Sequence, residues 1–108
     1  MALKQIEVFT LIAVLRLGDD AYGVSIHEET ERAAGRGVSM AGVYSALERL
    51  ERRGLTRSWL SEPRAEPGGR ARRHYTLTAR GRALVREERA RARRMWRGLT
   101  VDAPDRKQ

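Results

Sequence analysis

The sequence contains no cysteine among its 108 residues, and its only histidines are His27 and His74. Without cysteine the chain forms no disulfide, has no thiolate nucleophile and cannot build a zinc site that needs a cysteine ligand. Neither histidine has the neighbours of a metal site or a catalytic triad. We therefore predict no metal and no cofactor, and we interpret both histidines as surface or structural residues.

Long apolar segments are also missing. The most apolar stretch, residues 8–15, is shorter than the roughly 18 residues that span a bilayer. It makes a poor signal peptide, because Glu7 precedes it and the polar residues 18–20 follow it without a small-residue cleavage site. We expect a cytoplasmic protein that does not enter a membrane.

Lysine is scarce, so nearly all the positive charge comes from arginine. Lysine and arginine together number 22 against 14 acidic residues, which leaves a formal net charge of +8 and a sequence pI of about 11.1. This excess favours a polyanionic partner, nucleic acid above all, although an anionic membrane surface also fits. The arginine bias has two interpretations: forked recognition of phosphates and bases, or codon usage in a GC-rich genome.

The periodicity of apolar residues predicts four helices and one hairpin. The first helix is apolar nearly all round, so we expect it to be buried on two sides, the second side against a partner subunit. Asp20, Ser39 and Thr78 are the predicted N-caps of the later helices, and Gly54 ends the third. The tail, residues 101–108, carries no pattern and is predicted to be disordered. The expected helices cover residues 3–17, 21–34, 39–53 and 78–99, and the expected strands cover residues 55–60 and 72–77.

Three helices followed by a hairpin is the order of a winged helix-turn-helix. The second and third helices, joined by a short turn that contains glycine, supply the helix-turn-helix, and the hairpin is the wing. The predicted fold class is therefore mostly α with a small β-hairpin. At this length we expect one modest core and no separate ligand-binding domain.

The third helix would be the recognition helix, because its N-terminal residues reach base edges in the major groove. An apolar stripe fills one side, which leaves the other side for DNA. Ala41 can touch a thymine methyl, Ser45 can bond to several bases, and Arg49 can fork to a guanine or grip a phosphate. The apolar stripe consists of Met40, Val43, Leu47 and Leu50, and the opposite face consists of Ala41, Gly42, Ser45, Arg49 and Arg52.

Three positions near this face have a second interpretation. Gly42 indicates either a close approach of the backbone to DNA or a neighbour, or a position that tolerates any small residue. Tyr22 and Tyr44 either reach phosphates with their hydroxyls or are simply half-buried aromatics. We include all three, with the capping Ser39, among the predicted DNA contacts.

The predicted wing carries four arginines close to a turn rich in glycine and proline. Such a loop beside a recognition helix suits the adjacent minor groove or its phosphates, while the other interpretation is a solvated, charged turn. Because the helix-turn-helix directly precedes the wing, we favour DNA contact. The four residues are Arg64, Arg70, Arg72 and Arg73.

Three motifs resemble those of PadR-like transcriptional regulators. Residues 21–26, AYGVSI, resemble the YG-x-x-I opening of the second helix in that family. Residues 43–55, VYSALERLERRGL, resemble its LY-x-x-L-x-R-L-E-x-x-G-L signature. Residues 68–81, GGRARRHYTLTARG, are similar to its GGR…R-x-Y-x-LT-x-x-G wing and helix start. Each motif alone is weak, but the three together, in this order and spacing, are specific.

The resemblance implies a bacterial transcriptional regulator of the short branch, which ends in a single C-terminal helix. It implies a homodimer, acting as a repressor on a palindromic operator, held by the last helix against the partner's first and last helices. Residues 1–77 would then form the DNA-binding domain, residues 78–100 the dimerisation helix and residues 101–108 the tail. The chain departs from the family at residues 41–42, where a small-then-polar pair is usual, and at Ser45, where proline is frequent.

The last helix permits such a dimer. Val85, Ala92 and Leu99 recur every seven residues, and only Glu88 interrupts the apolar seam. Five arginines cover the opposite side, and Glu87 is spaced to pair with Arg91. The predicted interface consists of Leu3, Ile6, Leu84, Val85, Ala92, Met95, Trp96 and Leu99.

Met95 and Trp96 together make an adaptable apolar surface of the kind that accepts a planar hydrophobic effector. The other interpretation is that Trp96 is ordinary interface packing. For the whole chain, the second hypothesis is a basic interaction module that binds RNA or a protein. An enzyme is not expected, because the sequence has no nucleophile–base pair, no paired carboxylates in a cleft and no phosphate-cradling glycine motif.

Overall fold

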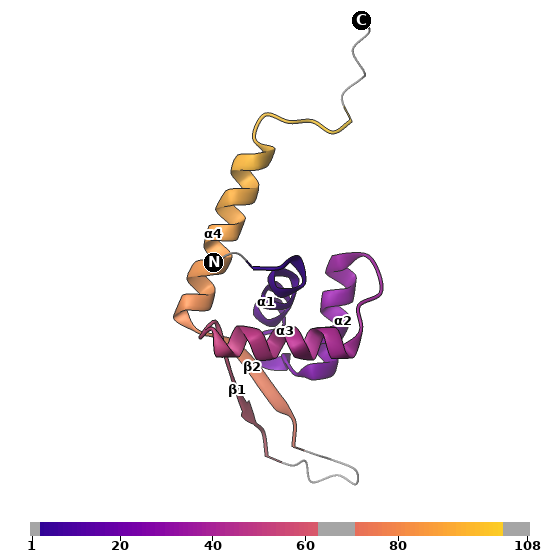
Figure 1. Cartoon of the computed structure of the whole chain (residues 1–108), viewed down its shortest axis with the longest axis vertical. Helices are drawn as coiled ribbons and strands as arrows, with labels where there is room; N and C mark the ends of the chain where they lie inside the picture. Colours follow the sequence, from indigo (N-terminus) through magenta and orange to yellow (C-terminus); the bar gives the residue numbers. More distant parts are fainter. Residues whose placement is uncertain (1–2, 63–70, 103–108) are drawn as a thin grey trace, which may run out of the picture.

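The computed structural model describes residues 3–62 and 71–102. Over these residues the chain folds into four α-helices and a two-stranded antiparallel hairpin, in the predicted order (Figure 1). The fold class, mostly α with a small β-hairpin, is confirmed. The elements are α1 (Gln5–Leu17), the 3₁₀ turn η1 (Gly18–Asp20), α2 (Gly23–Ala34), α3 (Met40–Arg52), β1 (Thr56–Leu60), β2 (Arg73–Leu77) and α4 (Ala79–Trp96).

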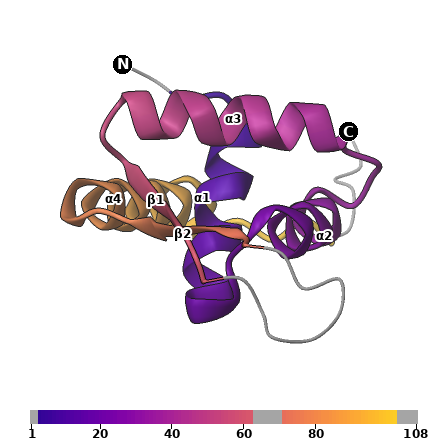
Figure 2. The ribbon, with the colours of Figure 1, turned by 90° about the horizontal axis from the view of Figure 1, so that it is seen from below.

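The core lies where α1, α2 and α3 meet, above the start of the hairpin. Figure 2 shows α3 running along one edge of the molecule, with α2 next to its N-terminal end. The predicted stripe of α3 is confirmed: Val43, Leu47 and Leu50 are at most 1% exposed, and Met40 is half-buried. Burying such side chains supplies most of the stability of a small domain. The stripe therefore fixes which side of α3 remains for a partner.

The core side of α1 is less apolar than the sequence suggests. Thr10 and Glu7 are buried there beside Leu11 and Val14. The Thr10 hydroxyl donates to the carbonyl of Ile6 at 2.7 Å, and the Glu7 carboxylate binds arginine, so both polar groups have partners. Buried polar groups are tolerated when they are hydrogen-bonded in this way.

The second helix begins two residues later than predicted, and Asp20 is not its N-cap. Asp20 lies in η1, and the next two residues are extended alongside β2. The Ala21 carbonyl accepts a hydrogen bond from the Tyr75 N–H at 2.9 Å, and Tyr22 forms an isolated bridge with His74. These contacts with a strand far along the chain delay the helix to Gly23.

The hairpin agrees with the predicted strands to within one residue. Its register runs from Thr56 opposite Leu77 to Leu60 opposite Arg73. Thr56, Tyr75 and Leu77 are buried towards the helices, whereas alternate residues face away, as the period of two requires. The hairpin is therefore packed on one face only.

Two glycines allow the start of the hairpin to pack closely against α3 and α4. Gly54 ends α3 with a φ of +75°, a conformation that other residues rarely adopt. At Gly81, in the first turn of α4, an added Cβ would lie 2.1 Å from the Leu55 carbonyl oxygen. Thr78 caps α4 as predicted, because its Oγ accepts from the Gly81 N–H at 3.0 Å. The glycines in these two motifs are thus explained by backbone conformation at position 54 and by packing at position 81.

The last helix ends three residues earlier than predicted. It stops at Trp96, a turn with Gly98 at a φ of +76° follows, and Leu99 lies beyond the helix. Figure 1 shows α4 leading away from the three-helix body, and only Gly81 is buried along its length. No helix within residues 3–62 and 71–102 is both long and apolar enough to cross a membrane. Of the predicted disordered tail, residues 103–108 lie outside the described part of the chain.

Candidate nucleic-acid interface

The outer face of α3 has small side chains at its start and charged ones towards its end. Ala41, Tyr44 and Ser45 are exposed, followed by Glu48 and Arg52, which form an ion pair at 3.8 Å. Ala41 and Ser45 therefore lie on the face where they were predicted. Helical spacing alone places Glu48 at the centre of this face, so sequence reasoning missed a carboxylate that it could have found.

The start of α3 is held by the predicted cap. The Ser39 Oγ accepts a hydrogen bond from the Gly42 N–H at 2.9 Å. A Cβ at Gly42 would meet only this same oxygen, at 3.0 Å. No other described neighbour requires a glycine there. Within the described chain, the only close neighbour of Gly42 is therefore the hydroxyl of its own helix cap, Ser39. A close approach to DNA and a tolerant position both stay possible interpretations of this glycine.

The Arg49 side chain turns towards α1 and not along the outer face of α3, where it was predicted to lie. Its Nε donates to the Glu7 Oε2 at 2.6 Å, across to α1, and the Arg49 side chain is two-thirds buried. The sequence did not predict this direction because Arg49 is at the edge of the polar stripe, where a long side chain can turn either way. A buried carboxylate on a distant helix decided the direction.

Four of the predicted contact residues line one groove. A cavity of about 360 Å³ separates the start of α2 from the returning strand of the hairpin. Arg72 stacks over the Tyr22 ring, with its Cζ 4.3 Å from the ring centroid. Tyr44 reaches in from α3, and Arg73 is exposed at the edge of the groove. The groove therefore joins α2, α3 and the wing, and it combines phenols with guanidinium groups.

Gly23 explains how Tyr44 reaches this groove. A Cβ at Gly23 would lie 2.1 Å from the Tyr44 hydroxyl oxygen, so the ring rests directly on the first turn of α2. The free N–H groups of a helix start attract anions. Tyr75 closes the groove on the core side, and burial raises the pKa of its phenol, which therefore stays neutral. Hydroxyls, arginines and a helix N-terminus around one hollow form an environment suited to a phosphate.

The outer face of the hairpin carries a stack that sequence reasoning missed. Trp59 and His74, which are cross-strand partners, stack with centroids 5.8 Å apart and planes inclined by 17°. Arg57 lies over the Trp59 ring at 5.8 Å, and Tyr22 meets His74 edge-on at 6.1 Å. His74 is thus structural, because it ties the wing to the start of α2. The pairing depends on the strand register, which the sequence does not specify residue by residue.

The remaining predicted contacts fall between the two strands of the hairpin in sequence. Arg64 and Arg70 lie outside the described residues, so their contact with DNA stays a prediction. Within residues 3–62 and 71–102, no group of three or more histidine, aspartate or glutamate side chains is arranged to hold a metal ion.

The chain matches known proteins over most of its length. The sequence model of the Transcriptional regulator PadR-like family matches residues 11–87. This chain belongs to that family. As a PadR-like protein it is a DNA-binding transcription regulator and not an enzyme. No curated protein sequence matches it.

Solved structures of two PadR-like proteins and of one further DNA-binding protein have a similar fold. A PadR family transcription regulator from Clostridium difficile is 24% identical, with a TM-score of 0.72 over 85% of this chain and 91% of that one. A PadR-like transcription factor from Bacteroides fragilis is 25% identical, with a TM-score of 0.62 over 82% of each chain. BpsR of Bordetella bronchiseptica, whose DNA binding is regulated by 6-hydroxynicotinic acid, is 27% identical, with a TM-score of 0.65 over 92% of this chain and 69% of that one.

The residues predicted for a PadR-like dimer divide into two groups. Leu3, Ile6, Leu84 and Val85 are half-buried within the chain itself. Ala92 and the residues after it are exposed, with exposed fractions of 66% for Met95, 57% for Trp96 and 65% for Leu99. Arg91 pairs with Glu88 at 3.4 Å and not with Glu87, so that predicted pair is wrong.

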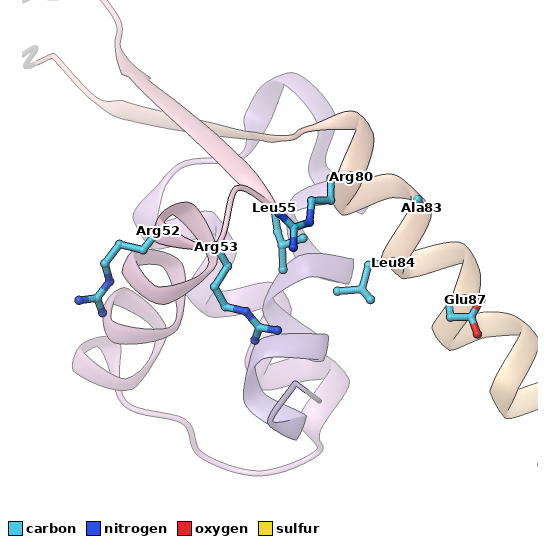
Figure 3. A pocket seen from close by; sticks show the side chains of 7 residues that line it. All are labelled: Arg52, Arg53, Leu55, Arg80, Ala83, Leu84 and Glu87. Atoms are coloured by element: carbon cyan, nitrogen blue, oxygen red, sulfur yellow. The ribbon is translucent and has the colours of Figure 1, made fainter. Parts of the chain in front are cut away.

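A larger groove of about 580 Å³ lies between the end of α3 and the first half of α4 (Figure 3). Its floor is apolar, with Leu55 and Leu84, and three arginines surround it. In Figure 3, Arg52 points outward from α3, whereas Arg53 turns its guanidinium towards α1. The last arginine of α3 and the arginine that caps it thus have different partners, Glu48 and Glu7.

Proposed function

We propose that this PadR-like chain binds a palindromic operator as a homodimer and represses transcription there. The observation that carries the proposal is the groove that gathers Tyr22, Tyr44, Arg72 and Arg73 beside the outer face of α3. In this proposal α3 enters the major groove, and the groove residues and wing hold the phosphates. The proposed contacts are Tyr22, Ser39, Ala41, Gly42, Tyr44, Ser45, Arg64, Arg70, Arg72 and Arg73.

The proposed dimer is supported by α4. Its 18 residues bury only Gly81, and Met95 and Trp96 are exposed near its end. In proteins most of the stability of a helix comes from tertiary packing of its apolar face. A second copy that covers the predicted seam would supply that packing, and it would pair two recognition helices for a two-fold operator.

We propose an effector site at the same seam, on Met95 and Trp96. The exposed apolar pair supports the location of the site. The similarity to BpsR, whose DNA binding is regulated by 6-hydroxynicotinic acid, supports the existence of an effector. A planar hydrophobic molecule between subunits would change the distance between recognition helices. Dye titration in a Trp59→Phe background isolates the emission of Trp96. Operator release that tracks quenching supports the site, and quenching without release makes Trp96 an ordinary interface residue.

The main experiment is selection of binding sites from random duplex DNA, followed by a reporter assay with the selected site. A palindromic consensus whose reporter is silenced by the protein supports a repressor, which we propose acts at the nucleoid in the cytoplasm. Binding to structured RNA with no enriched DNA sequence would instead favour the basic interaction module. The Tyr44→Phe variant should bind the selected site more weakly, because it keeps the ring but loses the hydroxyl that is proposed to bind a phosphate.

A further inference from the structure

A buried carboxylate joins α1 to the recognition helix. Glu7 is 3% exposed, in the first turn of α1. Its Oε2 accepts from the Arg49 Nε at 2.6 Å, and its Oε1 lies 3.9 Å from the Arg53 Nη1. The same Oε1 accepts from the Lys4 N–H at 2.8 Å, which orients the carboxylate. Glu7 is therefore fixed on its own helix and attached to two arginines at the end of α3.

This arrangement limits the positive charge that α3 can offer to DNA. The helix and its C-cap carry three arginines, and Glu7 is bound to two of them, Arg49 and Arg53. Arginine binds phosphate without regard to sequence, so each such contact strengthens operator and non-operator binding alike. Arg49 follows Ser45 by one helical turn, and without its carboxylate its long side chain could turn towards a phosphate.

We infer that Glu7 is a specificity-determining positioning residue: it holds Arg49 against α1 and away from DNA. Sequence-independent affinity is thereby kept low, and α3 is set at one angle to α1. This inference rests on the proposed function, since it assumes that α3 faces DNA. Glu7 itself lies behind the recognition helix and touches no base or phosphate in this scheme.

The test compares Glu7→Gln with a matched control, Glu29→Gln. Glu29 is also buried, at 8% exposed, and its carboxylate pairs with Arg32 at 2.6 Å and Arg16 at 3.4 Å. None of these partners is on α3, and both variants change the net charge by the same amount. Each full-length variant is titrated against the selected operator and a scrambled duplex over a range of salt concentrations.

We expect Glu7→Gln to bind scrambled DNA several-fold more tightly at low salt, with a log–log salt slope steeper by about one unit for one extra phosphate contact. The ratio of operator to scrambled affinity should fall. Glu29→Gln should leave the ratio unchanged. Equal changes in both variants would mean that net charge alone acts, and this would overturn the inference. Failure of the wild-type chain to bind DNA would overturn the proposed function instead.

A second variant keeps the test decisive if Glu7→Gln folds poorly. Arg49→Gln in the wild-type background removes the positive charge that Glu7 is inferred to hold away from DNA. Its salt slope on scrambled DNA should equal that of the wild type, because Arg49 does not contact phosphate. A slope shallower by about one unit would place Arg49 on DNA and overturn the inference.

Discussion

At some positions the packing is so close that a single added methyl group should destabilise the domain. Gly81 is the clearest case, because its Cα faces the Leu55 carbonyl. We expect Gly81→Ala to lower the free energy of unfolding by about 1–3 kcal/mol, since the methyl group forces α4 from β1. Gly37→Ala is the control: its nearest atom would be 3.9 Å away, and its effect should stay within about 0.5 kcal/mol. Urea unfolding of both variants measures the difference, and equal stabilities would contradict the packing argument.

Because of Glu7, the free energy of unfolding should depend on pH in the acidic range. Burial raises the pKa of Glu7, but the hydrogen bond from Arg49, the Lys4 N–H and the charges of Arg49 and Arg53 together hold it below its ordinary value of 4.5. The folded pKa is thus lower than the unfolded one. The stabilisation is complete above the unfolded pKa and is lost as the pH falls through the folded pKa.

We therefore expect Glu7→Gln to be less stable than the wild type at pH 7, by about 1–3 kcal/mol. The gap should narrow as the pH falls below 4.5. Urea unfolding of both proteins from neutral pH to a pH well below 4.5 follows this difference. A gap that stays constant over the whole range would show that Glu7 contributes through shape and not through charge.

At the scale of elements, the wing and α2 act together, because Arg72 stacks on Tyr22 and His74 links Tyr22 to Trp59. We expect Arg72→Ala to make the salt slope of operator binding shallower by about one unit, as loss of one phosphate contact would. Arg82→Ala on α4 removes the same charge away from the groove and should leave the slope unchanged. Equal slopes for Arg72→Ala and the wild type would mean that the groove does not contact DNA.

A variant can also test the role of α4 in the proposed dimer. The C-terminal half of this helix packs against no other element of the described chain. We expect Trp96→Glu to convert a dimer into a monomer, because a charge in an apolar seam is costly to bury. Val101→Glu is the control, since Val101 is 75% exposed beyond the helix. Light scattering gives the mass of each variant. A Trp96→Glu protein that keeps the wild-type mass would place the interface elsewhere.

At the scale of the whole molecule, the proposed dimer constrains the operator. Two recognition helices related by a two-fold axis read half-sites about 34–36 Å apart, one turn of DNA. Inserting about five base pairs, half a turn, between the selected half-sites places them on opposite faces of the duplex. Affinity should then fall to that of one half-site, whereas the same insertion outside the half-sites should have no effect. Unchanged binding to the duplex with separated half-sites would indicate that each subunit binds alone.

Much of this architecture follows from local pattern. The apolar stripe of α3, the caps Ser39 and Thr78 and the period of two in the hairpin all depend on residues close in sequence. Local rules therefore predict the element order, the winged-helix fold and the exposure of Ala41 and Ser45. The family motifs cover the same segments, and the glycines within them have direct physical reasons: a positive φ at position 54 and close packing at position 81.

Only the tertiary structure decided the features that depend on contacts between residues distant in sequence. The start of α2 was set by β2, 54 residues along the chain from Ala21 to Tyr75, and the direction of Arg49 was set by Glu7, 42 residues before it. A single hydrogen bond or ion pair can override local helix preference, which is worth less than about 1 kcal/mol per residue. Composition and spacing determined that this chain is basic, mostly helical and winged. Which arginines face outward was decided by the carboxylates that folding brought beside them.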